Sequence, residues 1–289
     1  MSNYTSYSAV RAGLGASKRL NIEDRYVFDR FYAPYQYLIK VPTAATDSIP
    51  LVSDAGINEL TTADGNRFDI RLEQAFAGSA PQVAPGSYGC LLGLDAADND
   101  GIGMDLGYGA ASAEVAHTRG AFVIGTDAAF FLRVKLMIAD VSDADQVAVG
   151  FVKGGWAADG LIATYTDSAL LNVDNGDVKL YTRLNSGTAG NVDSTDDVID
   201  HAADTANAVT LEVRVSSSGV VKYLIDGQAP TVDVTGFQFD TGDTVNAQLS
   251  VLTDVAGDPG VEVLEWESGF ISSRGLTGIS DLNEAEQSD

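Results

Sequence analysis

Residues 209–227, VTLEVRVSSSGVVKYLIDG, limit this chain to folds that contain a β-hairpin with one buried face. Apolar and polar side chains alternate over 209–215 and again over 221–225, which is the period of a strand that is apolar on one side. The residues between them, 216–219, are Ser and Gly, which suit a tight turn. A lone hairpin is marginal in water, so the rest of the chain must supply an apolar layer that faces it.

From residue 68 onward the sequence repeats the same pattern of short strands and polar turns. The turn at 174–177, DNGD, contains Asn-Gly, which is the strongest short signal for a hairpin. No helical period longer than about three turns competes with this pattern. The sequence therefore predicts an all-β fold, an antiparallel jelly-roll sandwich. The expected strands include 68–72, 102–106, 121–124, 130–140, 147–152, 161–165, 169–173, 178–184, 247–252 and 261–271.

The first forty residues differ in charge from the rest of the chain. They carry six Lys or Arg and three acids, which gives a charge of +3. Since the whole chain has a net charge of −24, the remaining residues carry −27. Asn21 is a suitable cap for a short helix over 22–32, and Pro34 would end it. We expect three parts: an N-terminal arm with a short helix at 1–60, a sandwich at 61–275 and an acidic tail at 276–289. The first part would serve as an attachment segment, or alternatively as a lid on the same domain.

Composition argues against several classes of partner. A net charge of −24 with an isoelectric point near 4.1 repels nucleic-acid phosphates and anionic lipid headgroups. The first fifteen residues lack the apolar run of a signal peptide, and no stretch is apolar for long enough to cross a bilayer, so we expect no classical export and no membrane partner. The single cysteine, Cys90, is followed by two leucines, which predicts a buried thiol.

Four stretches together resemble the concanavalin A-like, or laminin G-like, jelly-roll family. They are GIGMDLG at 101–107, the run 121–155, the hairpin 209–230 and VEVLEWESGFI at 261–271. In that family a strand, a turn and a strand ending in Tyr-x-x-Asp-Gly precede the last strands, and 223–227 matches this. The resemblance covers roughly residues 88–272 and implies the fold far more specifically than an activity. FFLRVK at 130–135 and GFVKGG at 150–155 are also similar in style to structural proteins of tailed bacteriophage particles.

Catalysis is poorly supported by the residues. Glucanases of this sandwich use carboxylates in a Glu-x-Asp-x-x-Glu arrangement on one strand face, because retaining hydrolysis needs a nucleophile and an acid about 5 Å apart. Here Glu265 and Glu267 share a face, Glu262 lies opposite, and Gly269 stands where a third acid is wanted. The two histidines, His117 and His201, have no neighbouring nucleophile. We therefore expect no enzyme activity, with glycoside hydrolysis as the least favoured alternative.

Two loops carry clustered oxygen ligands of the kind that calcium prefers. The first offers Asp95, Asp98 and Asp100 before Gly101, and the second surrounds Gly176. Neither has the complete EF-hand pattern, and Asp before Gly is also ordinary turn chemistry, so we expect no cofactor, with calcium at the first loop as the alternative. A sugar site would need an exposed aromatic platform, for which the candidates are Trp156, Tyr165 and Trp266.

The sequence favours a noncatalytic structural protein of a virion, a capsid decoration or head-surface protein assembled in the host cytoplasm. Its N-terminal segment would bind a major capsid or other virion protein, with homo-oligomers, trimers among them, as an expected assembly. The alternative is a carbohydrate-binding, lectin-like module, which would bind a host-surface glycan. The residues expected to bind the partner are basic or aromatic: Arg11, Lys18, Arg19, Arg25, Tyr26, Phe28, Arg30, Phe31, Tyr32, Tyr35 and Tyr37.

Overall fold

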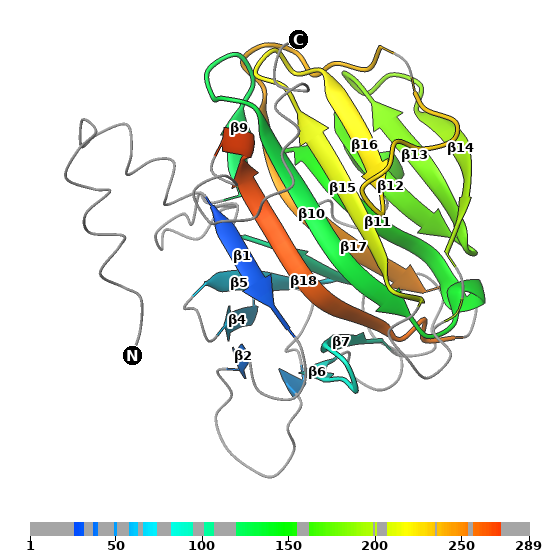
Figure 1. Cartoon of the computed structure of the whole chain (residues 1–289). Coiled ribbons are helices and arrows are strands. Elements are labelled where there is room, and N and C mark those ends of the chain that lie inside the picture. Colours follow the sequence, from blue (N-terminus) through cyan, green and yellow to red (C-terminus); the bar gives the residue numbers. More distant parts are fainter. Residues whose placement is uncertain are drawn as a thin grey trace, which may run out of the picture.

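The described residues form two antiparallel sheets packed face to face. We call them sheet A, which lies in front in Figure 1, and sheet B, which lies behind it. The structure is a computed structural model. It describes residues 26–31, 37–39, 49–50, 58–62, 66–73, 82–94, 101–106, 120–154, 162–198, 200, 207–234, 236–253 and 257–272. None of the helical segments within these ranges has the length and apolar character needed to cross a membrane.

Sheet A is built around the long strands β10 and β18. Its order is β16 (Val221–Ile225), β15 (Val209–Val215), β10 (Phe130–Ile138), β18 (Val261–Phe270), β7 (Cys90–Gly93), β6 (Gln82–Pro85) and β3 (Ile49–Pro50), and β1 (Val27–Arg30) also pairs with β18. Sheet B is built around β11 and β17. Its order is β14 (Gly190–Asp197), β13 (Asp177–Arg183), β12 (Ser168–Asp174), β11 (Ala144–Lys153), β17 (Thr244–Thr253), β8 (Gly101–Asp105), β5 (Arg67–Glu73), β4 (Asn58–Thr62) and β2 (Tyr37–Ile39), and β9 (Ala121–Val123) also pairs with β17.

The core lies between the two sheets and follows from strand alternation. On β10 the side chains at 130, 132, 134, 136 and 138 point inward and are completely buried. Two aromatic clusters lie at different places in this layer. Phe122 stacks on Phe130 with ring centroids 4.3 Å apart, whereas Phe68 meets the edge of Trp266 at 5.4 Å. The apolar layer that the hairpin needs is therefore the inner face of sheet B, and the jelly-roll prediction is confirmed.

Both hairpin predictions are confirmed. β15 and β16 pair with Val213 opposite Tyr223, and the Asp226-Gly227 turn has the positive φ angles of 50° and 78° that these residue types tolerate. β12 and β13 are joined by Asn175 and Gly176, with φ angles of 50° and 92°. Positive φ at both central residues is the requirement of the type I′ turn, whose twist matches that of the flanking strands.

The prediction of a helix over 22–32 is wrong where the structure describes it, because 27–30 form β1. Val27, Asp29 and Phe31 point into the sandwich and are buried, whereas Phe28 and Arg30 point outward. This period of two fits a strand, and the strand hydrogen-bonds to an edge of β18 over Glu265–Ser268 that would otherwise be unpaired. β3 and β4 also pair with β6 and β5, so the sandwich contains strands from both sides of residue 60.

Two other segments differ from the sequence prediction. Residues 161–165 were expected to form a strand, but Ile162–Thr164 form a short 3-10 helix, η2. Conversely, β14 was missed because its sequence, GNVDSTDD, has no apolar alternation. Its edge is irregular, with Thr195 at φ 61°, and it is partly covered by Thr231 and Val232, whose backbone N–H groups donate to Asp196 and Ser194. A bulged, acidic and partly covered edge resists pairing with another chain.

Candidate functional site

The outer face of sheet B carries a group of buried, uncharged polar side chains. On β11, Val147, Val149 and Phe151 point into the core, so the alternate residues point outward. The outward residues of β11, β12 and β17 place carboxamides and hydroxyls side by side, all of them 6% exposed or less. We call this surface the amide face. It consists of Gln146, Ser168, Asn172, Asn246, Gln248 and Ser250.

The strand register fixes how these side chains are arranged. Asn172 of β12 lies beside Ala148 of β11, which lies beside Ser250 of β17. Two residues further along, Gly150 separates Leu170 from Gln248, and a further two along, Val152 separates Ser168 from Asn246. The amide face therefore crosses three neighbouring strands, with small or apolar residues of β11 along its middle. It lies at the back of the molecule in the view of Figure 1.

Residues 162–165, which come after β11 in the chain, pack over part of the amide face. Ile162 and Tyr165 pack with Ala148, Leu170 and Tyr181 in a second apolar cluster, separate from the main core. Hydrogen bonds hold this segment in place: Gln248 Nε2 donates to the Tyr165 hydroxyl at 2.6 Å, and the Ile162 backbone N–H donates to Gln146 Oε1 at 3.0 Å. Gln146 and Gln248 therefore have a structural task.

Three oxygens of the amide face are buried and have no hydrogen-bond partner within the protein: Ser168 Oγ, Asn172 Oδ1 and Asn246 Oδ1. The amide nitrogen of Asn246, by contrast, donates to the carbonyl oxygen of Gly154 at 2.6 Å. A buried polar atom without a partner costs about 1–3 kcal/mol of stability, so three of them on one face call for an explanation. Such oxygens are suited to accept hydrogen bonds from the hydroxyl groups of a ligand or from water.

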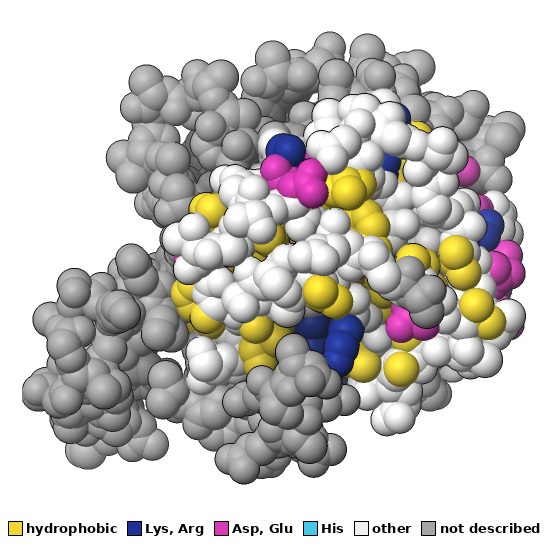
Figure 2. Space-filling model, turned by 90° about the horizontal axis from the view of Figure 1, so that it is seen from above, with side chains coloured by type: hydrophobic (Ala, Val, Ile, Leu, Met, Phe, Trp, Pro, Cys, Tyr) yellow, Lys and Arg dark blue, Asp and Glu magenta, His cyan; other side chains and the backbone are white. Residues whose placement is uncertain are grey.

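Two lysines near the amide face are held in ion pairs. Lys153, at the end of β11, places its Nζ 2.6 Å from Asp243 Oδ1 and 3.5 Å from Asp167 Oδ2. The hydrogen bond to Asp243 raises the pKa of the Lys153 ammonium above its ordinary value. Figure 2 shows the sandwich from above the view of Figure 1, with the described Lys and Arg side chains and the Asp and Glu side chains in small, separate clusters.

The second of these lysines, Lys179 on β13, lies directly beside Asn172 in the strand register. Its Nζ is 2.6 Å from Asp174 Oδ2 and 4.0 Å from Asp177 Oδ2. The hydrogen bond to Asp174 raises the pKa of the Lys179 ammonium. This ion pair occupies the Asp-Asn-Gly-Asp loop that the sequence offered as a second group of calcium ligands.

The carboxylates considered for hydrolysis lie in sheet A and are engaged. Glu265 and Glu267 share an outer face with Arg133, whose Nη1 is 3.4 Å from Glu267 Oε2 and 4.0 Å from Glu265 Oε2. The Tyr26 hydroxyl also donates to Glu267 Oε1 at 2.8 Å. Glu265 and Glu267 thus share one arginine, and Glu267 has a second contact through Tyr26, so both carboxylates belong to an ion-pair and hydrogen-bond network.

Glu262 has a different structural role. Its carboxylate accepts hydrogen bonds from the backbone N–H groups of Ser87, Tyr88 and Gly89, at 3.1, 2.7 and 2.7 Å. Three successive N–H groups form a concave anion site, and Glu262 fills it from β18. This contact joins β18 to the turn between β6 and β7.

The expected metal and sugar residues fall in different places. Asp95, Asp98 and Asp100 lie outside the described residues, and so does Trp156. Within the part of the chain that the structure describes, no three His, Cys, Asp or Glu side chains come together as a metal site. Tyr165 is 3% exposed and Trp266 is fully buried, so neither is the exposed platform that a sugar would stack on.

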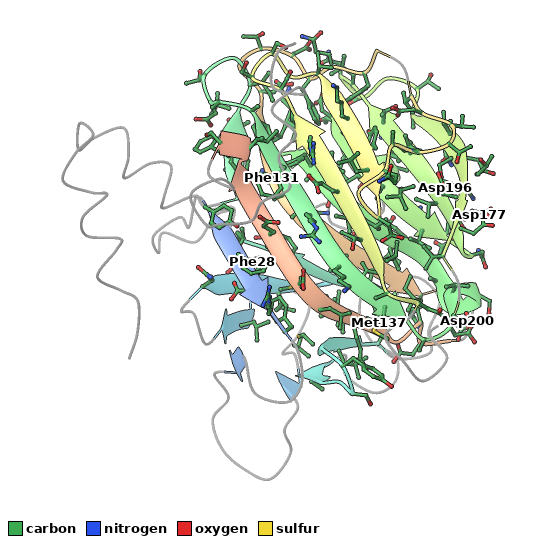
Figure 3. The ribbon with its side chains drawn as sticks, in the orientation of Figure 1. Phe28, Phe131, Met137, Asp177, Asp196 and Asp200 are labelled. Carbon is green, nitrogen blue, oxygen red and sulfur yellow. The ribbon has the colours of Figure 1, made fainter. Side chains whose placement is uncertain are left out.

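The expected partner-binding residues are also only partly described. Phe31 is wrongly placed in that set, because it is fully buried and its ring meets the edge of Phe68 at 5.6 Å. Phe28 lies on the outer face of sheet A, as Figure 3 shows, with the Arg30 guanidinium 5.1 Å from its ring centroid. Arg11, Lys18, Arg19, Arg25, Tyr32 and Tyr35, and the side chain of Tyr37, lie outside the described residues.

Sequence reasoning missed the amide face. Its signal was present in and directly before the predicted strands 169–173 and 247–252. Asn246, Gln248 and Ser250 stand at every second position, and Ser168 and Asn172 are four residues apart, which places them on one face of their strand. In so acidic a chain, a solvated strand face would be expected to carry Asp or Glu at such positions. The departure becomes meaningful only when the register shows that both sets lie on one face.

No protein-family model matches the sequence, and no curated protein matches it either. Solved structures with a similar fold include the carbohydrate recognition domain of Emp46p in a potassium-bound form, with 10% identity, a TM-score of 0.46 and coverage of 70% of this chain and 88% of that one. The carbohydrate recognition domain of Emp47p has 15% identity and a TM-score of 0.43, and the match covers 81% of this chain and 97% of that one. The ligand-binding domain of botulinum neurotoxin serotype D in complex with N-acetylneuraminic acid has 10% identity and a TM-score of 0.40. The match covers 88% of this chain and 49% of that one. The fold assignment of this chain rests on its own strand pairing.

Proposed function

We propose that the protein is a noncatalytic, lectin-like module that binds a carbohydrate on the amide face. The observation that carries the proposal is the set of three buried acceptor oxygens without partners, on a face whose other polar groups are also amides and hydroxyls. Sugar hydroxyls donate and accept hydrogen bonds at close spacing, and neutral amide side chains match both roles. The Emp46p and Emp47p domains that share this fold are carbohydrate recognition domains.

Maintaining these oxygens unpaired is costly unless they serve a purpose. Each destabilises the free protein by about 1–3 kcal/mol, and folds retain such groups chiefly where a ligand or water satisfies them. A ligand hydroxyl that donates to Asn172 or Asn246 would recover that cost on binding. The proposal therefore explains both the chemistry of the face and its incomplete hydrogen bonding.

The proposal is tested by screening the whole protein against a glycan array and measuring the affinity of the best ligand by calorimetry. Asn172→Ala removes one acceptor of the amide face, and we expect affinity to fall about 5–10-fold, the effect of about 1–1.4 kcal/mol. Gln238→Ala is the matched control, because it removes an exposed amide that donates to the Ser218 carbonyl oxygen, away from the amide face. A folded protein that binds no glycan, or two variants with equal affinities, would contradict the proposal.

Absence of catalysis is part of the same proposal and has its own assay. Incubation of the best-bound oligosaccharide with the protein should release no new reducing ends. If hydrolysis did appear and were lost in Glu265→Gln or Glu267→Gln, the ion-pair role assigned to these residues would be incorrect.

Attachment to a larger assembly, such as a phage virion, is the second candidate. The observation that favours it is the charge contrast between the basic beginning of the chain and its acidic remainder. The deletion that tests it should remove residues 1–25 only, because β1 begins at Val27 and belongs to sheet A. Under this candidate the deletion abolishes co-sedimentation with the assembly and leaves glycan binding unchanged. Undiminished co-sedimentation would exclude an attachment role for that segment.

A further inference from the structure

We infer that residues 162–165, which we call the cover, move to admit a ligand to the amide face, and that Tyr165 holds the ligand's place until they do. This inference rests on the proposed function, because it concerns how a glycan reaches the same face. It is drawn from the burial of the amide face, from the hydrogen bonds that join the cover to it, and from the anchoring of the chain next to the cover.

The amide face is closed to a ligand while the cover is in place. Its six polar residues are each 6% exposed or less, and the three oxygens without a partner in the protein belong to this buried surface. A hydroxyl group must come within about 3 Å of an acceptor to donate to it, so a glycan can reach these oxygens only after a segment packed on the face has moved. Among the described residues, the cover packs there and is hydrogen-bonded to the face.

The strand register places the cover next to all three of these oxygens. On β17, Gln248 is bonded to the cover and stands two residues from Asn246. On β12, Leu170 packs against the cover and stands two residues from both Ser168 and Asn172. Residues two apart on a strand point to the same face and are roughly 7 Å apart. Movement of the cover therefore gives a ligand access to the oxygens from this side.

Tyr165 makes contacts on the amide face of the kind that a sugar would make. Its hydroxyl accepts a hydrogen bond from Gln248 Nε2 at 2.6 Å, and its ring belongs to the apolar cluster of Ala148 and Leu170. Gly150, between Leu170 and Gln248 in the register, has no side chain that would obstruct such a ring. Tyrosine combines an apolar body with a polar tip, and a pyranose ring likewise has a C–H face and a hydroxyl edge. The two therefore compete for one surface.

The chain is anchored immediately after the cover, which gives the cover a point about which to turn. The carbonyl oxygens of Thr166 and Asp167 accept from the backbone N–H groups of Ser186 and Lys153, at 2.8 and 2.9 Å, and β12 begins at Ser168. The cover itself consists of the short 3-10 helix η2 and one further residue. A short segment beside such an anchor opens at a lower cost in free energy than the strands beneath it.

Hydrogen exchange of the whole protein, without any glycan, tests whether the cover opens. The Ile162 backbone N–H donates to Gln146 Oε1, so its exchange reports the opening. We expect it to exchange about 100-fold faster, or more, than the N–H groups of β11 and β17 under native conditions. Tyr165→Phe removes the hydroxyl bonded to Gln248 and should speed this exchange about fivefold, the effect of one hydrogen bond. Equal protection of Ile162 and the strands in the wild-type protein would overturn the inference, whatever the glycan array shows.

Glycan binding tests whether Tyr165 competes with the ligand. When a ligand binds only the open form, its apparent affinity is reduced by the fraction of molecules that are open. We therefore expect Tyr165→Phe to bind the best glycan from the array about fivefold more tightly than the wild type, and Tyr165→Ala to bind it at least as tightly as Tyr165→Phe does. Tyr223→Phe is the matched control with unchanged affinity, because it removes the hydroxyl of a buried tyrosine in the main core, away from the amide face.

Circular dichroism confirms that each variant is folded before its affinity is compared. Equal or weaker binding by both Tyr165 variants, with clear binding by the wild type, would overturn this inference and leave the proposed function standing. Absence of binding in the wild type and in both variants would overturn both.

Discussion

Ser168 and Ser194 offer a direct test of the claim that the amide face contains unpaired oxygens. Both are serines of sheet B with fully buried side chains, on β12 and β14. Ser194 Oγ donates to the Val178 carbonyl oxygen at 2.6 Å and accepts from the Asp196 N–H at 3.1 Å. Ser168 Oγ has no partner within the protein. The same substitution to alanine therefore removes two hydrogen bonds at one site and an uncompensated hydroxyl at the other.

The expected magnitudes follow from this difference. Ser194→Ala loses two bonds worth about 0.5–1.5 kcal/mol each and leaves buried partners unsatisfied, so we expect a loss of about 2 kcal/mol. Ser168→Ala removes a buried hydroxyl that costs about 1–3 kcal/mol while the methylene remains, so we expect no loss, or a gain of about 1 kcal/mol. Equilibrium unfolding in urea, with unchanged m-values, measures both. A loss of 2 kcal/mol for Ser168→Ala would refute the reasoning, because it would mean that the hydroxyl is satisfied in the free protein.

Three further predictions concern other described contacts. Glu262→Ala should destabilise the protein by about 2–3 kcal/mol in urea unfolding, because three backbone N–H groups lose their acceptor; an effect below about 0.5 kcal/mol would show that water replaces the carboxylate. Burial raises the pKa of the Cys90 thiol, so it should react with a thiol reagent at pH 8 only after denaturation, and fast labelling of the native protein would contradict this. The pKa of Lys153 is higher in the folded protein than the ordinary lysine pKa of about 10.4. Its contribution to stability should therefore be complete at neutral pH and be lost as the pH rises through the pKa of the folded protein. Lys153→Met should cost about 1–2 kcal/mol at pH 7, reduced for the 35% exposure of the side chain, and should flatten this alkaline loss; an unchanged alkaline profile would remove Lys153 as its source.

The parts of the fold that could be predicted are those in which local pattern and tertiary role agree. The β15–β16 hairpin and the Asn175-Gly176 turn were correct because alternation and turn chemistry are both local properties. β1 was misread because Asn21, with acids after it, resembles a helix start, whereas the strand is determined by a distant partner, β18. β14 was missed for the opposite reason, since its polar sequence becomes a strand only through pairing with β13.

The candidate site could not be predicted for the same reason. Asn172, Asn246 and Gln248 lie on strands that are far apart in the sequence, and their proximity depends on the pairing of β12 and β17 with β11. The carboxylates Glu265 and Glu267 attracted attention because they are close in sequence, but Arg133 from β10 gives them a structural task. Sequence spacing identified residues on one strand, and the register identified the surface.

The most direct test of the account is a two-dimensional NMR titration of the side-chain amide groups with the best glycan from the array. The account predicts that the carboxamide signals of Asn172, Asn246 and Gln248 shift with a common affinity, whereas the signal of Gln238 stays in place. Shifts confined to groups outside the amide face, with these three signals unmoved at saturation, would contradict the claim that this face holds the ligand.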